Sequence, residues 1–154
     1  MNAGRASETI YLDANATMPL RPSARAALLD ALERYGNPSS VHRAGRDARA
    51  LVEDAREAIA AAVGAGAPQV IFTSGATEAN ALALRGLATA MRCRTVLASA
   101  VEHPSVLAHV ESGNVLPVDS RGEIDLAALE GALAATRAGP VLVAVMAANN
   151  ETGT

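Results

Sequence analysis

Apolar residues recur along this chain at two spacings, which predict helices and short strands in turn. A spacing of three or four residues predicts helices over about 23–35, 46–63 and 77–91. Two further helices are expected to begin at Pro104 and after Asp125, because proline suits the first helical position and aspartate caps free N–H groups. In the second helix, the stripe expected to be buried consists of Leu51, Ala55, Ile59 and Val63.

Short β-rich runs separate these helices. Strands are expected at 69–73, 95–98 and 115–118, and the continuous apolar run 141–146 is typical of a strand buried on both faces. Strands that alternate with helices favour an α/β fold with a mainly parallel sheet, flanking helices and right-handed crossovers. Because the chain stops in turn residues just past this central-looking strand, we expect the next strand and a covering helix to be missing.

The first of three polar strand ends is the segment 73–78. Ligands of open parallel sheets bind outside the carboxyl ends of the strands. Gly75 and Ala76 are small enough for backbone N–H groups to approach an anion at the start of the next helix, and Thr77 adds a hydroxyl donor. The segment is therefore a candidate phosphate cradle. An ordinary strand-to-helix turn has the same composition, so the residues alone leave both interpretations open.

The other two strand ends carry His103 and the pair Asn149-Asn150. A histidine directly before a helix is suited to stack on a planar ligand or to move a proton, and it is equally suited to cap the helix. An asparagine carboxamide can donate to a ligand oxygen, or simply form a turn. Because the carboxyl ends of parallel strands share one edge, we predict that the three segments converge on one crevice.

Composition excludes several classes of function. A net charge of -3 and only three aromatic residues argue against nucleic-acid binding. No apolar run approaches the ~18 residues of a membrane span, and the N-terminal residues lack the apolar core of a secretory signal. The lone Cys93 excludes an internal disulfide, and the histidines lack metal-like spacing, so no metal site is expected. We expect a cytoplasmic protein that acts on a small molecule.

All thirteen basic residues are arginine, and the chain contains no lysine. Chemistry that needs a lysine amine, such as a Schiff base, cannot be completed by this chain alone. Cys93 stands between Arg92 and Arg94 with no base beside it in the sequence. We therefore interpret it as a bystander thiol.

Several short motifs together resemble the N-terminal part of a cysteine desulfurase of the class V aminotransferase group, a family that uses pyridoxal 5'-phosphate (PLP). They occur in family order and at family spacing from about Ile10 onward, and the set is specific although no single motif is. The motifs are Tyr11-Leu12-Asp13 with Ala16-Thr17, 36–40 with His42, 72–78 with Asn80, Glu102-His103, and Asn149-Asn150-Glu151 with Gly153.

The resemblance implies a fold and a set of roles. Residues 1–154 would be the incomplete N-terminal part of an aminotransferase class V domain, within the large domain of the fold-type I PLP-dependent transferases. Ala76 and Thr77 would hold the cofactor phosphate, and Asn150 would contact the ring hydroxyl or the substrate carboxylate. His103 would stack on the pyridine ring and take part in proton transfer, which makes it the expected catalytic residue. The implied reaction converts L-cysteine to L-alanine and leaves the sulfur as an enzyme-bound persulfide.

The resemblance also implies what this chain lacks. The family's Schiff-base lysine, persulfide cysteine, pyridine-facing aspartate and substrate-binding arginine would lie beyond residue 154, and Cys93 does not occupy the persulfide position. PLP would then be held non-covalently at most, and the chain alone is expected to be inactive. The family further implies a sulfur acceptor or scaffold protein, a role in iron–sulfur cluster assembly, and a homodimeric full-length enzyme.

Two alternatives remain open at the level of sequence. The first is a selenocysteine lyase or another class V PLP enzyme, a choice that depends on residues downstream. The second is a non-catalytic remnant that binds a phosphate or a partner and performs no chemistry.

Overall fold

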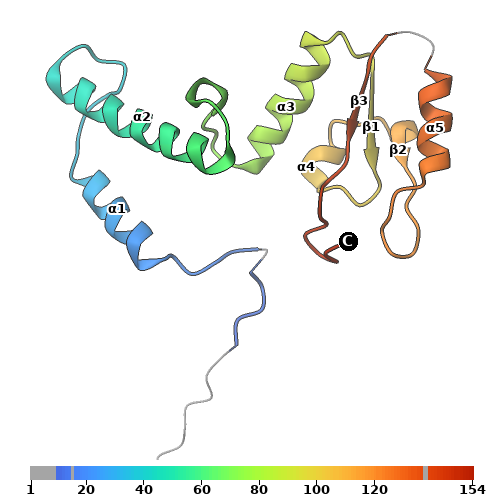
Figure 1. Ribbon diagram of the computed structural model, residues 1–154, viewed down its shortest axis with the longest axis horizontal. Helices are drawn as coiled ribbons and strands as arrows, with labels where there is room; N and C mark the ends of the chain where they lie inside the picture. The colour runs from blue at the N-terminus through green and yellow to red at the C-terminus, as the bar shows by residue number, and fades with distance from the viewer. Residues whose placement is uncertain (1–9, 15, 137–138) are drawn as a thin grey trace, which may run out of the picture. The chain divides into compact units, whose positions relative to one another are not determined.

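The computed structural model describes residues 10–14, 16–136 and 139–154. The chain divides into two compact units, Met1–Phe72 and Thr73–Thr154, and each has its own elements and contacts (Figure 1). No helix in the described part of the chain is long and apolar enough to cross a lipid bilayer.

The described part of the first unit contains two α-helices and a short 3-10 helix. These are α1 (Pro22–Leu32), α2 (Arg43–Val63) and η1 (Ala67–Gln69). The start of α2 is capped by His42, whose Nδ1 accepts the N–H of Gly45 at 3.3 Å. The helix ends at Gly64, whose φ of 68° lies in the left-handed region that glycine adopts without strain. The two long helices expected here are confirmed.

The expected buried stripe of α2 is wrong. Ile59 is 43% exposed and Val63 is 68% exposed, whereas the buried residues of the helix are Gly45 and Ala60. A helical spacing identifies the apolar face, but burial also needs an element that covers that face. Within the described part of this unit, the element packed most closely against α2 is the short η1, which is too small to cover the stripe.

The expected strand at 69–73 is also wrong. The N–H of Val70 donates to the carbonyl of Ala67 at 3.1 Å, and the carbonyl of Val70 accepts from the Arg56 guanidinium. The same guanidinium lies 5.0 Å from the centre of the Phe72 ring. Because both backbone groups of Val70 have local partners, neither is available to a sheet ladder. High β-propensity produces a strand only where a neighbouring strand completes the pairing.

The second unit is a parallel sheet with flanking helices. Among the described residues of this unit, the three strands run in the order β2-β1-β3 and both pairings are parallel, which confirms the expected α/β fold class. Helices begin at the two expected positions, and the Asp125 carboxylate accepts the N–H of Ala128 at 3.0 Å. The elements are α3 (Ala76–Ala90), β1 (Thr95–Ser99), α4 (Pro104–Leu107), η2 (Ser112–Asn114), β2 (Val115–Leu116), α5 (Leu126–Ala135) and β3 (Val141–Ala144).

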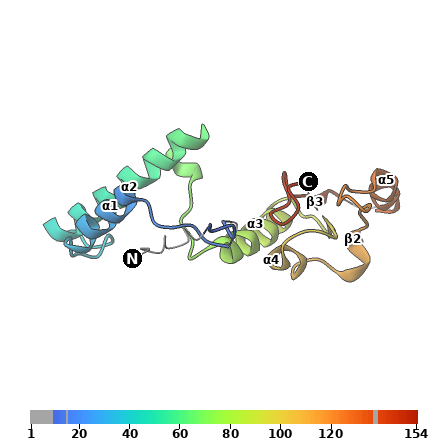
Figure 2. The ribbon, with the colours of Figure 1, turned by 90° about the horizontal axis from the view of Figure 1, so that it is seen from below.

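The core of this unit lies between the sheet and two helices. Leu84 of α3, Ala98 of β1 and Val106 of α4 are buried together, and partly buried apolar residues of β1 and β3 pack around them. Figures 1 and 2 show α3 and α4 on the opposite side of the strands from α5. No residue of α5 is buried. The packing therefore fixes α3 and α4 on the sheet, and these helices carry the candidate site.

The run 141–146 does not form a strand buried on both faces. Its strand, β3, lies at an edge of the described sheet, and β1 occupies the centre. Val143 of β3 is 39% exposed. A continuous apolar run is equally compatible with a central strand and with an edge strand, because composition does not report how many neighbours a strand has.

Candidate active site

The junctions that follow β1 and β3 lie side by side at one edge of the sheet. Glu102, which is buried, accepts the backbone N–H of Met146 through Oε1 at 2.6 Å. The Asn149 side chain donates from Nδ2 to the carbonyl of Val101 at 3.1 Å. These two bonds hold the segment that carries His103 against the segment that follows β3.

The start of α3 is joined to the same edge through α4. Asn80 donates from Nδ2 to Ser105 Oγ at 2.8 Å, across the contact between the two helices. Thr77 lies one turn before Asn80 on the same face of α3. The three segments predicted to converge are thus linked, although the hydrogen bonds that link them are made by Asn80, Glu102 and Asn149 rather than by Thr77, His103 and Asn150.

The first turn of α3 has the properties of an anion site. Gly75 is the N-cap residue and has no side chain to cap the helix, so the first N–H groups, including those of Ala76 and Thr77, have no acceptor within the helix. A Cβ placed on Gly75 would meet nothing within 4 Å, so there is open space beside the N-cap residue. Thr77 is exposed and adds its hydroxyl. This arrangement fits a phosphate group at the positive end of a helix.

Glu78 determines which donors remain for such an anion. Its Oε2 accepts both the hydroxyl of Ser74 at 2.6 Å and the backbone N–H of Ser74 at 2.7 Å. The Ser74 hydroxyl, followed by the Ser74 N–H, holds the pKa of this carboxyl below its ordinary value. The Ser74 donors are therefore occupied by a carboxylate, and Ala76 and Thr77 are the neighbouring groups left to bind a ligand.

His103 is exposed and lies at the N-cap of α4. Its Nδ1 contacts Ser105 Oγ at 2.8 Å and accepts the Ser105 backbone N–H at 3.1 Å. Together with Asn80, Glu102 and the end of β3, the ring lines a cavity of about 430 Å³. This volume lies within the range of small-molecule sites. The ring is therefore held through one nitrogen at the edge of a cavity large enough for a ligand.

The two asparagines after β3 have different environments. Asn149 is 9% exposed, and its Oδ1 accepts the N–H groups of Glu151 at 2.8 Å and Thr152 at 2.9 Å. Asn150 is exposed, and its Nδ2 donates to Glu151 Oε1 at 2.8 Å. Asn149 therefore builds the turn, whereas Asn150 presents its carboxamide at the surface of that turn.

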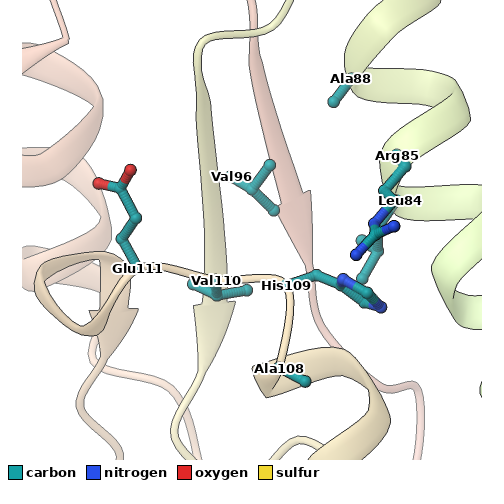
Figure 3. Close-up of a pocket in the computed structure, with 8 residues that line it drawn as sticks. All are labelled: Leu84, Arg85, Ala88, Val96, Ala108, His109, Val110 and Glu111. Carbon is teal, nitrogen blue, oxygen red and sulfur yellow. The ribbon is translucent and has the colours of Figure 1, made fainter.

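A second cavity of this unit contains none of the predicted site residues. It measures about 410 Å³ and lies between α3, β1 and the segment that follows α4. Figure 3 shows the side chains of Arg85 and His109 on the same side of this cavity.

Cys93 precedes β1, whereas His103 follows it, so the thiol and the candidate site lie at opposite ends of the strand. No group of His, Cys, Asp and Glu residues in the described segments is arranged to hold a metal ion.

Sequence reasoning did not assign roles to Asn80, Glu102 and Ser105, which form the polar framework of the site. The first two belong to the motifs that carry the family resemblance, so their positions gave a signal. Ser105 gave none, because a serine near a helix start has the same appearance whether it faces solvent or a neighbouring helix.

Comparisons with known proteins agree with this fold. The model of the family described as aminotransferase class-V matches residues 10–154. The cysteine desulfurase IscS of Dictyoglomus turgidum is 42% identical over 94% of the chain, and a cysteine desulfurase of Cereibacter sphaeroides is 45% identical over 96%. The chain covers 39% and 40% of these two relatives, so it spans about two fifths of their length.

Solved structures give the same result for the fold. The X-ray structure of a NifS-like protein from Rickettsia africae aligns with 95% of the chain at a TM-score of 0.80 and 33% identity, and the chain covers 41% of that structure. Another structure titled NifS-like protein gives a TM-score of 0.78 at 34% identity, over 92% of the chain. The likeness confirms the expectation that the sheet and its helices are part of the large domain of the fold-type I transferases.

Proposed function

Because the chain belongs to the aminotransferase class-V family, we propose that it is the N-terminal part of a PLP-dependent cysteine desulfurase. The carrying observation is that relatives titled cysteine desulfurase match 94–96% of the chain at 42–45% identity. The joined segments of the second unit support the same proposal, because they link α3, which begins at the candidate anion site, to the segment that carries His103 at the edge of a parallel sheet.

We propose that the start of α3 binds the phosphate of PLP. The N–H groups of Ala76 and Thr77 and the Thr77 hydroxyl would donate to the phosphate oxygens, and the helix dipole would favour their negative charge. When bound, PLP supplies an electron sink for bond cleavage at the amino acid. The role of the chain is to orient the cofactor and to place its own polar groups around it.

His103 and Asn150 are the other two proposed ligand groups. The His103 ring would stack on the cofactor ring and hold or move a proton during sulfur release. The Asn150 carboxamide, which is exposed on the turn built by Asn149, would donate to the ring hydroxyl or to the substrate carboxylate. The proposed substrate is L-cysteine, and the proposed products are L-alanine and a protein-bound sulfur that passes to an acceptor or scaffold protein in the cytoplasm.

We further propose that these 154 residues do not release sulfur by themselves. The sequence contains no lysine, so the amine that would bond PLP covalently has to come from another segment. PLP would bind this chain non-covalently at most. The complete enzyme would be a homodimer.

A chimaera tests the proposal. Residues 10–154 replace the matching segment of the Dictyoglomus turgidum cysteine desulfurase, which is 42% identical to this chain. We expect the chimaera to bind PLP and to release sulfide when L-cysteine and a thiol reductant are added, and we expect the 154-residue chain alone to release none. The same assay with L-selenocysteine distinguishes a selenocysteine lyase. A folded chimaera that neither binds PLP nor releases sulfide would contradict the proposal and favour the non-catalytic remnant.

Two substitutions in the chimaera separate the proposed roles. His103→Gln should leave PLP bound but lower the rate of sulfide release by about 100-fold, the usual contribution of a proton-transfer group. Thr77→Val removes one donor to a charged oxygen and should weaken PLP binding by about tenfold. Thr89→Val, at an exposed position in the last turn of α3, is the matched control for the loss of a hydroxyl.

A further inference from the structure

We propose that Asn80 and Ser105 are positioning residues that fix the tautomer of His103, so that the hydrogen of the neutral ring is on Nε2. The importance of this tautomer rests on the proposed function, in which His103 faces the cofactor. The tautomer itself follows from three hydrogen bonds among the described residues, which run from Asn80 to Ser105 Oγ and from Ser105 to Nδ1.

The backbone of Ser105 makes the first part of the case. Its N–H lies 3.1 Å from His103 Nδ1, and a backbone N–H can only donate. Nδ1 must therefore present a lone pair in this arrangement. A neutral imidazole carries one hydrogen, so that hydrogen is on Nε2.

The hydroxyl of Ser105 provides the second argument for the Nε2–H tautomer. It has a single hydrogen, and its oxygen accepts from Asn80 Nδ2 at 2.8 Å. The hydroxyl hydrogen is then available to Nδ1 of His103, which lies 2.8 Å from Oγ. The Asn80 amide thus orients the hydroxyl hydrogen toward Nδ1, since an amide nitrogen can donate to Oγ but cannot accept from it.

The surroundings strengthen both bonds. Ser105 is 8% exposed, and Asn80 is half-buried where α3 contacts α4. Water competes poorly with hydrogen bonds in such a position, and a chain of bonds polarises each of its members. The three residues lie on two different elements that pack together, so the arrangement is a property of the fold rather than of one flexible loop.

The consequence for the site is a defined donor. With Nδ1 engaged twice by Ser105, Nε2 is the ring nitrogen left for a ligand, and it presents a hydrogen. Asn80 and Ser105 therefore set the direction in which His103 donates without touching the ligand themselves.

Long-range proton–nitrogen NMR spectra of the 154-residue chain test this proposal, at a pH where the imidazoles are neutral. The His103→Gln variant assigns the His103 signals among those of the three histidines. We expect the Nε2–H pattern for His103. In Ser105→Ala the share of the Nδ1–H form should rise by roughly fivefold, the ratio set by one ordinary hydrogen bond. Ser112→Ala, on η2, is the matched control and should leave the pattern unchanged.

A second variant reverses the donor-to-acceptor direction of the hydrogen bonds that link residue 80, Ser105 and His103. In Asn80→Asp a carboxylate replaces the amide donor, so the Ser105 hydroxyl turns toward the new acceptor and its oxygen becomes free to accept from Nδ1. We expect this variant to raise the Nδ1–H share at least as much as Ser105→Ala does. Asn37→Asp adds the same charge to the first unit, where Asn37 Oδ1 accepts the Ser39 N–H at 2.9 Å and a carboxylate can do the same.

Two results would overturn the proposal. One is a predominant Nδ1–H form in the unsubstituted chain, and the other is an unchanged tautomer ratio in both variants while circular dichroism reports intact helices. The spectra require neither PLP nor cysteine. An inactive chimaera would therefore count against the proposed function alone, and an unexpected tautomer would count against this inference alone.

Discussion

Glu102 and Met146 are 44 residues apart in the sequence, yet the Glu102 carboxylate accepts the Met146 backbone N–H at 2.6 Å. Glu102 also accepts the hydroxyl of Ser99, the last residue of β1, at 3.2 Å. One buried side chain thus joins the ends of the two paired strands β1 and β3. It also fixes the backbone directly before His103.

Removal of this carboxylate should destabilise the second unit. Glu102→Ala leaves the Met146 N–H without its buried acceptor, and we expect a loss of about 2 kcal/mol in the free energy of unfolding. Glu102→Gln keeps an acceptor and should cost less. Urea denaturation followed by circular dichroism measures both. Glu111→Ala, at an exposed position, is the control, and an equal loss in this control would contradict the assignment.

The pKa of Glu78 should lie below its ordinary value of 4.5, because the Ser74 hydroxyl and the Ser74 N–H both donate to the carboxylate. Its ionised form is favoured by folding, so the contribution to stability is present above the unfolded pKa and is lost as the pH falls through the lower, folded pKa. A carbon-detected NMR titration of the Glu78 carboxyl checks the direction. Ser74→Ala should move the pKa upward, whereas Ser39→Ala should not.

Asn149 should hold the turn that presents Asn150. Its side chain accepts from Glu151 and Thr152 and donates to Val101, so Asn149→Ala removes three hydrogen bonds at once. We expect amide hydrogen exchange at Glu151 and Thr152 to accelerate by at least tenfold. Asn150→Ala is the matched control, and similar acceleration in that variant would show that the turn does not depend on Asn149.

The 154-residue chain should associate in solution. β3 is an edge strand of the described sheet, and large apolar side chains such as Val143 and Leu126 are exposed. Open strand edges and apolar surface favour pairing between copies. Size-exclusion chromatography with light scattering should detect oligomers or aggregates, and Val143→Lys should reduce them more than Leu126→Lys on α5. A chain that elutes only as a monomer would contradict this prediction.

Local signals in the sequence predicted where elements begin. Proline at position 104 and the capping carboxylate of Asp125 act within one helical turn, so a single sequence carries all the information they need. The parallel orientation of the strands also followed from their alternation with helices. These predictions succeeded because the interactions behind them are local, or because chain chirality restricts the alternatives.

The predictions that the structure contradicts all depend on which elements lie beside a segment. Whether 69–73 pairs as a strand, whether Ile59 is buried, and whether β3 lies at the centre depend on what lies beside each segment, and a one-dimensional pattern does not contain that information. The same reason explains why only part of the candidate site was predicted from the sequence. Thr77, His103 and Asn150 were predicted from their chemistry at expected strand ends, although no described strand precedes Thr77, whereas the contact between Asn80 and Ser105 depends on how α3 packs against α4.

The position of Cys93 has a practical consequence. The chain has one thiol, and it lies before β1, whereas His103 lies after it, so five strand residues, or roughly 17 Å, separate the two ends. A maleimide fluorophore attached there would occupy a single known place and leave the cavity beside His103 unobstructed. The molecule therefore already carries an attachment point for an optical reporter of ligand binding, with no cysteine to engineer in or remove.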